Sequence, residues 1–86
     1  MSIQDLYELF MKSSGVATDS RKIKANCIFF SLKGTNFNGN EFAKSAIEKG
    51  AMYAIIDEKK YLEEKENYIL VDNSLATLQQ LSLIHI

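Results

Sequence analysis

Residues 27–57 read CIFFSLKGTNFNGNEFAKSAIEKGAMYAIID and contain two apolar runs with an amphipathic segment between them. The runs at 27–32 and 51–56 lack strict alternation of apolar and polar residues, which predicts strands that are buried on both faces. Residues 41–49 place apolar side chains on one helical face, and Gly50 can end that helix. The order of strand, helix and strand predicts an α/β fold, a small βαβ-containing sheet flanked by helices.

Shorter elements are expected on both sides of this unit. An apolar stripe predicts a helix over 3–12, and an extended segment follows over 16–20. A further strand is expected over 68–71, followed by a last helix from Leu75. We expect Asn40 to cap the central helix, because Asn is a preferred N-cap residue. The buried face of that helix is expected to consist of Phe42, Ala43, Ala46 and Ile47.

Composition excludes several classes of function. The 86 residues carry 10 Lys or Arg and 11 Asp or Glu, a net charge of -1, which argues against a nucleic-acid partner or a polybasic membrane patch. The single cysteine, Cys27, rules out a disulfide framework and a multi-cysteine zinc site. No apolar run approaches the roughly 20 residues of a membrane span. We therefore expect a cytoplasmic, monomeric single domain without a membrane or nucleic-acid partner.

Residues that usually carry catalysis are scarce. His85 is the sole histidine, and a catalytic base would need a nucleophile and an orienting group beside it. Cys27 opens an apolar strand, where a small buried hydrophobe is favoured over a reactive thiolate. Neither G-x-x-x-x-G-K-[ST] nor G-x-G-x-x-G occurs in the chain. The sequence therefore predicts no catalytic residue, no metal ligand and no P-loop.

A first polar cluster, Thr18-Asp19-Ser20-Arg21, follows a short apolar stretch. Arg21 is a natural partner for a carboxylate or a phosphate, so the cluster could bind an anionic group. The alternative is a turn in which Asp19 accepts backbone N–H groups and pairs with Arg21. The residues by themselves favour the turn.

A second polar cluster spans residues 34–40 and is rich in Gly and Asn. It lies between a predicted strand and a predicted helix, and ligands of α/β sheets favour this location outside the carboxyl ends of strands. Backbone groups of the loop could face a ligand, and Phe37 could support a flat ring. The alternative is an ordinary loop in which Phe37 fills the core. Neither cluster by itself identifies a ligand.

Both clusters belong to one longer pattern, which runs from Thr18-Asp19-Ser20-Arg21 through residues 28–34 and 36–42 to residues 46–51. Over about residues 1–81 this pattern resembles the N-terminal domain of the Mur ligases, the ATP-dependent enzymes that build the peptide of peptidoglycan. It is most similar to the members that add D-alanyl-D-alanine to UDP-MurNAc-tripeptide. The members that add the third peptide residue are a close second.

The resemblance implies a three-domain enzyme, with residues 1–81 as the first domain. This domain would hold the UDP part of UDP-MurNAc-tripeptide. ATP and Mg²⁺ would bind a central domain and D-alanyl-D-alanine a C-terminal domain, both outside these residues. The family makes an acyl phosphate from the substrate carboxylate, which the amine then attacks. No cofactor is expected within these 86 residues, and the chain alone is expected to be inactive.

The resemblance also implies a set of site residues. Those that would contact the UDP moiety are Thr18, Ser20, Thr35, Asn36 and Phe37. Those that would support these loops are Asp19, Arg21 and Gly34. Backbone groups of a Gly- and Asn-rich loop can supply the donors and acceptors that a uracil edge requires.

Three stretches depart from the family pattern. Ala25-Asn26 stands where the family has Pro-Gly, and Asn can keep the turn because it tolerates left-handed backbone. Asn38-Gly39-Asn40 replaces Asp-Gly-His, so any contact of that histidine is lost. Residues 81–86 read like one frame of a transposon end used in sequencing-library adapters, so we expect 82–86 to be a non-native tail. The alternative is a genuine apolar helix that docks on the sheet.

Two rival functions stay open at this point. The chain could be the same domain of a ligase that adds the third peptide residue. It could also be a small α/β interaction module without a ligand. The exposed apolar patch of such a module would consist of Leu78, Leu81, Leu83 and Ile84.

Overall fold

The centre of the computed structural model, which describes residues 3–33, 38–62 and 67–85, is a four-stranded sheet. Its strands pair in the order β1-β2-β3-β4, and all three pairs are parallel. The strands are β1 (Val16–Ala17), β2 (Ile28–Phe30), β3 (Tyr53–Ile56) and β4 (Tyr68–Leu70). The expected α/β fold with its βαβ unit is therefore confirmed.

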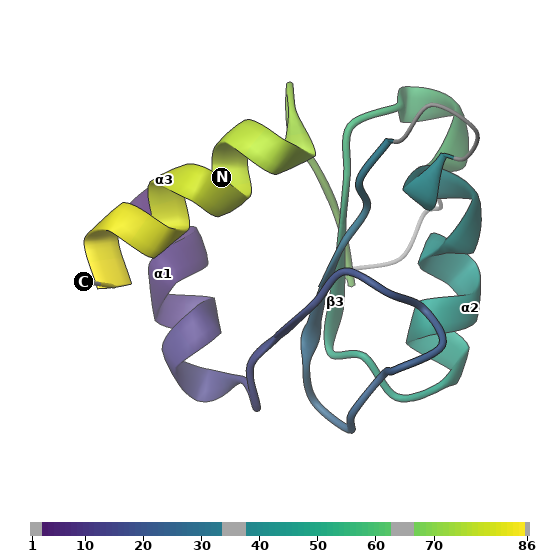
Figure 1. Cartoon of the computed structure of the whole chain (residues 1–86), viewed down its shortest axis with the longest axis horizontal. Helices are drawn as coiled ribbons and strands as arrows, with labels where there is room; N and C mark the ends of the chain where they lie inside the picture. The colour runs from purple at the N-terminus through teal and green to yellow at the C-terminus, as the bar shows by residue number, and fades with distance from the viewer. Residues whose placement is uncertain (1–2, 34–37, 63–66, 86) are drawn as a thin grey trace.

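Helices cover both faces of the sheet (Figure 1). On one face lie α1 (Ile3–Lys12) and α3 (Ser74–His85), which contact each other, and on the other lies α2 (Ala43–Glu48). Two short 3-10 helices, η1 (Gly39–Phe42) and η2 (Lys59–Tyr61), precede α2 and follow β3. The start of α2 therefore lies at the carboxyl ends of the strands, where its backbone N–H groups and side chains can build a site.

Two apolar clusters explain why the strands carry no polar alternation. The cluster beneath α1 and α3 is formed by Leu6, Ile28, Phe30, Ile55, Ile69 and Leu81. The cluster beneath α2 includes Phe29, Ala43, Ala46, Ala54, Ile56 and Tyr68. Successive residues of β2 and β3 thus enter opposite clusters, and burying each Phe or Ile side chain stabilises the fold by about 1.5–3 kcal/mol.

The start of the central helix differs from the prediction. η1 begins at Gly39, and its N-cap is Asn38, whose side chain accepts a hydrogen bond from the Asn40 N–H at 3.0 Å. The expectation that Asn40 caps the helix is wrong, because its side chain is buried and faces the interior. Phe42 is 42% exposed and does not belong to the buried face, whereas Ala43 does.

The last helix confirms one expectation and corrects another. It begins at Ser74, and the Asn73 side chain caps it by accepting a hydrogen bond from the Ala76 N–H at 3.0 Å. The predicted exposed patch is wrong at Leu81, which is 2% exposed, although Leu83 is 73% exposed. The Ile84 side chain lies outside the part of the chain that is described, and a non-native tail at 82–86 stays a prediction.

The turn that leads into β2 depends on Asn26, which has a left-handed φ of 66°. Its N–H donates to the Gly50 carbonyl at 2.8 Å, and its carbonyl accepts from the Ser14 N–H at 3.0 Å. Asn is one of the few residues with a side chain that tolerate this backbone region. The expectation that Asn26 preserves the turn is confirmed. No helix among residues 3–33, 38–62 and 67–85 has the length and hydrophobicity to cross a bilayer.

We predict that Asn26→Val lowers the free energy of unfolding by about 1–2 kcal/mol, because a β-branched residue is strained at positive φ. Asn26→Gly should leave stability unchanged or raise it, since glycine adopts this φ without strain. Urea unfolding of the 86-residue chain measures both effects. The dependence of the unfolding free energy on urea concentration should be the same in all variants. The control is Ala25→Val at the exposed neighbouring position. If Asn26→Val and Ala25→Val lowered the free energy of unfolding equally, the explanation by backbone strain at position 26 would be contradicted.

Candidate functional site

Residues Thr18–Arg21 form a turn at the carboxyl end of β1, closed by Asp19 and Arg21. Asp19 Oδ1 accepts the Arg21 backbone N–H at 2.9 Å and Nε at 3.1 Å, and Oδ2 accepts Nη2 at 3.0 Å. The hydrogen bonds from the Arg21 side chain, and after them the one from its backbone N–H, lower the pKa of Asp19 to about 2. The turn expected from the sequence is confirmed. It leaves the Arg21 side chain 83% exposed beside a pocket.

That pocket has a volume of about 410 Å³ and lies on the α2 side of the sheet. It is lined by Thr18, Asp19, Ser20, Arg21, Phe29, Gly39 and Phe42. The structure thus brings together four of the residues predicted from the sequence. The predicted residues Gly34, Thr35, Asn36 and Phe37 lie outside the described part of the chain. Pockets of this size accommodate small organic ligands.

Gly39 and Phe42 were not predicted as site residues, although both lie in the 36–42 part of the longer sequence pattern. The Gly39 N–H donates to the Leu32 carbonyl at 2.7 Å. A Cβ at Gly39 would lie only 2.5 Å from that oxygen and 2.6 Å from the Leu32 nitrogen. Glycine is therefore required for η1 to approach the end of β2 and form one wall of the pocket.

A second pocket, of about 460 Å³, adjoins the first and shares Thr18 and Asp19 with it. Its remaining lining residues are Ser14, Gly15, Val16, Ala17, Lys22, Lys24 and Cys27. Cys27 is 3% exposed, as expected for a small buried hydrophobe. The lysines give this side of the turn a positive charge.

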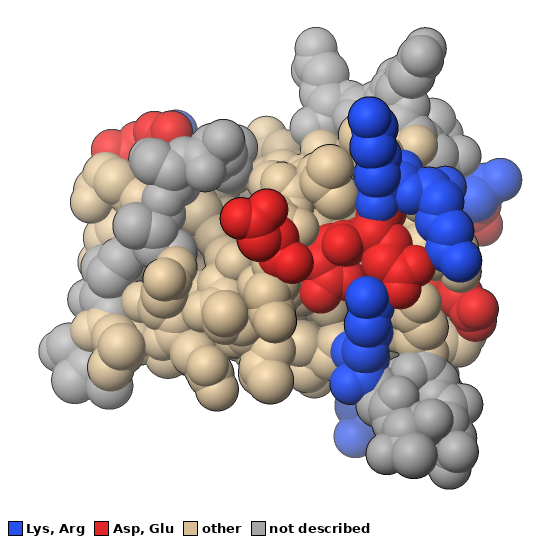
Figure 2. Space-filling model, turned by 90° about the horizontal axis from the view of Figure 1, so that it is seen from above, with Lys and Arg blue, Asp and Glu red and all other residues tan. Residues whose placement is uncertain are grey.

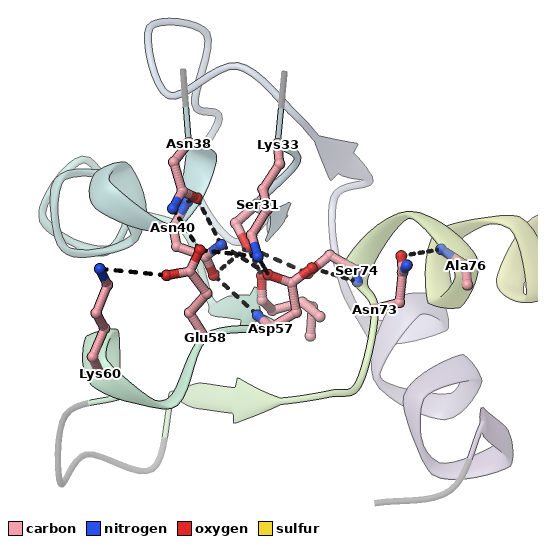
Figure 3. A network of polar contacts seen from close by, with 11 residues as sticks. Ser31, Lys33, Asn38, Asn40, Asp57, Glu58, Lys60, Asn73, Ser74 and Ala76 are labelled. Carbon is pink, nitrogen blue, oxygen red and sulfur yellow. Dashed lines mark hydrogen bonds and ion pairs between the residues drawn. The ribbon is translucent and has the colours of Figure 1, made fainter. Parts of the chain in front are cut away.

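A buried polar network occupies the carboxyl ends of β2 and β3 (Figure 3). Its inner members, Ser31, Asn40 and Ser74, are each at most 1% exposed. Ser31 Oγ is within hydrogen-bond distance of two acceptors, Asn40 Oδ1 at 3.0 Å and the Ile55 carbonyl at 2.8 Å. It also lies 3.3 Å from the hydroxyl oxygen of Ser74. Buried polar groups in such a network must satisfy one another, because none can reach water.

Asp57 connects this network to α3. Asn40 Nδ2 donates to Asp57 Oδ1 at 2.8 Å, and the Asp57 N–H donates back to Asn40 Oδ1 at 3.0 Å. Asp57 Oδ2 accepts the Ser74 N–H at 3.0 Å. Burial opposes ionisation of Asp57, but the hydrogen bonds from Ser74 and Asn40 outweigh it, so the pKa of Asp57 lies below its ordinary value.

The outer rim of the network carries charges. Glu58 Oε1 lies 2.9 Å from Lys33 Nζ and accepts a hydrogen bond from the Asn38 side-chain amide at 2.6 Å. Glu58 Oε2 lies 3.8 Å from Lys60 Nζ. The hydrogen bond from Lys33 is the main cause that lowers the pKa of Glu58. Figure 2 shows acidic side chains gathered between lysine and arginine side chains on this surface. This edge is filled by the protein's own polar groups, so the pocket beside β1 is the better candidate site.

Comparison with known proteins gives a family match and several relatives. The family model described as Mur ligase family, catalytic domain, matches residues 12–84. A UDP-N-acetylmuramoyl-tripeptide--D-alanyl-D-alanine ligase of Bacillus subtilis is 41% identical over 70 residues, 79% of this chain and 15% of the relative. A UDP-N-acetylmuramoyl-L-alanyl-D-glutamate--2,6-diaminopimelate ligase of Fusobacterium nucleatum is 39% identical over 62 residues, 72% of this chain and 13% of the relative.

A solved structure with a similar fold is that of MurF ligase from Thermotoga maritima in complex with ADP. Its TM-score is 0.75 at 25% identity, over 87% of this chain and 17% of that protein. The chain therefore spans less than a fifth of the length of these relatives.

The Asp19–Arg21 pair gives a prediction for the titration of Asp19. Carboxyl NMR signals should report a pKa of about 2 for Asp19, and Arg21→Ala should raise this pKa toward the ordinary aspartate value of 3.8. Lys22→Ala is the matched control, because Lys22 acts on Asp19 only through space and should move the pKa less. An unchanged Asp19 pKa in Arg21→Ala would mean that the pair does not form in solution.

The amide of Asn40 gives a second prediction, based on charge. Asn40→Asp would put a carboxyl group about 2.8 Å from Asp57 and should lower the free energy of unfolding by about 3 kcal/mol at pH 7.5. The two neighbouring carboxyl groups repel each other when both are ionised, so one of them has a higher pKa in the folded than in the unfolded chain, where it is about 4. As the pH falls through that raised pKa, this group becomes protonated and the loss of unfolding free energy becomes smaller.

Urea unfolding at pH 7.5 and pH 5 measures this loss. The matched control is Asn73→Asp, which replaces one good N-cap residue by another at an exposed position and should cost almost nothing at pH 7.5. A loss for Asn40→Asp that is the same at both pH values would contradict the charge explanation.

Proposed function

The chain belongs to the Mur ligase family, and from that premise we propose that it is the N-terminal domain of a MurF-type ligase. Such a ligase adds D-alanyl-D-alanine to UDP-N-acetylmuramoyl-tripeptide in peptidoglycan synthesis. The proposal is supported by the Bacillus subtilis relative and by the fold of the Thermotoga maritima MurF ligase. The Fusobacterium nucleatum relative, a diaminopimelate ligase, makes the same domain of a MurE-type ligase the second candidate.

Within the ligase, we assign this domain the binding of the UDP moiety. The observation that carries this assignment is the pocket beside β1, because Thr18–Arg21 face Gly39 and Phe42 across it. These residues come from the 18–21 and 36–42 parts of the sequence pattern that resembles the family. The site would hold one end of a long substrate and so position the reacting end on another domain.

The chemistry of the pocket suits a nucleoside with an attached anion. Phe29 and Phe42 offer apolar ring surfaces against which a uracil can pack. Thr18 and Ser20 hydroxyl groups and the backbone of the turn offer donors and acceptors for the edge of the ring. Arg21, 83% exposed, offers a charge for a phosphate. Thr35, Asn36 and Phe37 remain predicted members of the same site.

We propose that ATP and Mg²⁺ bind outside these 86 residues. The sequence has no phosphate-cradling G-x-x-x-x-G-K-[ST] stretch. Among residues 3–33, 38–62 and 67–85, no three His, Cys, Asp or Glu side chains could hold a metal ion together. ATP, Mg²⁺ and D-alanyl-D-alanine would bind the parts of a full-length ligase that this chain does not cover.

The remaining expectations are carried forward as proposals. We propose a monomer that acts in the cytoplasm without a nucleic-acid or membrane partner. The rival interaction module is less well supported, because Leu81, one member of its proposed apolar patch, is buried in the same cluster as Leu6 of α1.

UDP binding can be tested by NMR on the 86-residue chain. Millimolar UDP should shift the amide signals of Thr18, Ser20, Gly39 and Phe42, and uridine should reproduce the shift at Phe42. Phe42→Ala should weaken UDP binding about fivefold, because about 1 kcal/mol of ring packing is lost. Leu70→Ala is the matched control, since Leu70 is equally exposed, at 42%, and lies outside the pocket. An absence of any shift in these residues would refute the assignment.

A further inference from the structure

We propose that Asn40 is a positioning residue for the nucleotide pocket and that, through Asp57, it links the pocket wall to the start of α3. The pocket wall is η1, whose residues Gly39 and Phe42 line the pocket. The ligand part of this inference rests on the proposed function. The link itself is a property of the fold and can be tested without a nucleotide.

The link requires a carboxamide at position 40. Asn40 Nδ2 donates to Asp57 Oδ1 and to Asn38 Oδ1, each at 2.8 Å. Asn40 Oδ1 accepts from the Asp57 N–H and from Ser31 Oγ, each at 3.0 Å. Both ends of one amide are thus used, at a position that is 1% exposed. A group that only donates or only accepts would leave buried partners unsatisfied.

On the pocket side, Asn40 controls the position of its neighbour Gly39. The Gly39 N–H is bonded to the Leu32 carbonyl at 2.7 Å, and the two backbones approach too closely for a Cβ. A shift of Asn40 toward or away from Asp57 therefore moves Gly39 against Leu32 or breaks their hydrogen bond. Phe42 lies in the same short 3-10 helix, so its ring moves with that wall.

On the helix side, Asp57 holds the first turn of α3. Its Oδ2 accepts the Ser74 N–H at 3.0 Å, and the Asp57 side chain is 11% exposed. Ser74 Oγ also lies 3.3 Å from Ser31 Oγ, which is bonded to Asn40 (Figure 3). Two short routes of hydrogen bonds therefore join the pocket wall to α3. Because coupling is reciprocal, a ligand that fixes the wall also fixes the start of α3.

The start of α3 provides its own control for this link. The Ser74 N–H depends on Asp57, whereas the Ala76 N–H is bonded to the exposed side chain of Asn73 at 3.0 Å. Asn40→Ala breaks the link, and Asn73→Ala removes an ordinary helix cap of the same residue type. Both variants destabilise the chain, so a general loss of stability affects them alike.

Amide hydrogen exchange without nucleotide tests the link directly. Asn40→Ala should speed exchange of the Gly39 and Ser74 amides about tenfold relative to that of Ala76. Asn73→Ala should speed exchange at Ala76 and leave Gly39 unchanged. Should Asn40→Ala fail to fold, Ser31→Ala keeps the Asn40–Asp57 pair and should speed exchange at Gly39 and Ser74 about threefold. A change at only one of these two amides, or at neither, would overturn the link.

UDP titration tests the consequence for binding. Asn40→Ala should raise the dissociation constant for UDP about tenfold, whereas Asn73→Ala should leave it unchanged. In the unmodified chain, UDP should also shift the Ser74 amide, and this shift should vanish in Asn40→Ala while that of Thr18 persists. Equal dissociation constants in the two variants would overturn the positioning role. If no residue responded to UDP, the proposed function would fail, and the exchange measurement would still decide the link.

Discussion

Two hydrogen bonds between Asn40 and Asp57 hold together the carboxyl edge of the sheet. The strands beneath them are buried on both faces, and Ser31, Asn40 and Ser74 at their ends are each at most 1% exposed. Each such group must find a partner inside the protein, or its desolvation is not offset. The Asn40–Asp57 pair meets this requirement for the ends of β2 and β3 and for the first N–H of α3.

This arrangement also decides where a ligand can bind. In parallel sheets, ligands favour the carboxyl ends of strands, but here the network and its rim of Lys33 and Glu58 fill that place over β2 and β3. The open space is shifted toward the edge strand β1, between the turn of Asp19 and Arg21 and the wall formed by η1. The nucleotide site that we propose therefore lies beside β1 and not over the ends of β2 and β3.

Most elements of the fold could be predicted because their signals are local. The runs around Phe29 and Ile55 are apolar on both faces, and Gly50 marks the end of the helix between them. The Asp19–Arg21 turn was predictable because its partners are two residues apart. The role of Asn40 was not predictable, since an Asn before a helix normally caps it, and its actual partner Asp57 lies 17 residues away. Phe42 was assigned to the core because helical periodicity does not register the 3-10 turn at which it lies.

The sequence by itself determined the α/β class, the order of the elements, the left-handed turn at Asn26 and the two polar clusters, because each depends on residues that are near neighbours in the chain. Only the tertiary structure decided that Thr18–Arg21 face Gly39 and Phe42 across one pocket, and that Asn40 is an interior hydrogen-bonding residue. The reason is physical: close approaches such as that of Gly39 to Leu32, and the pairing of buried polar groups, arise only when distant segments pack together.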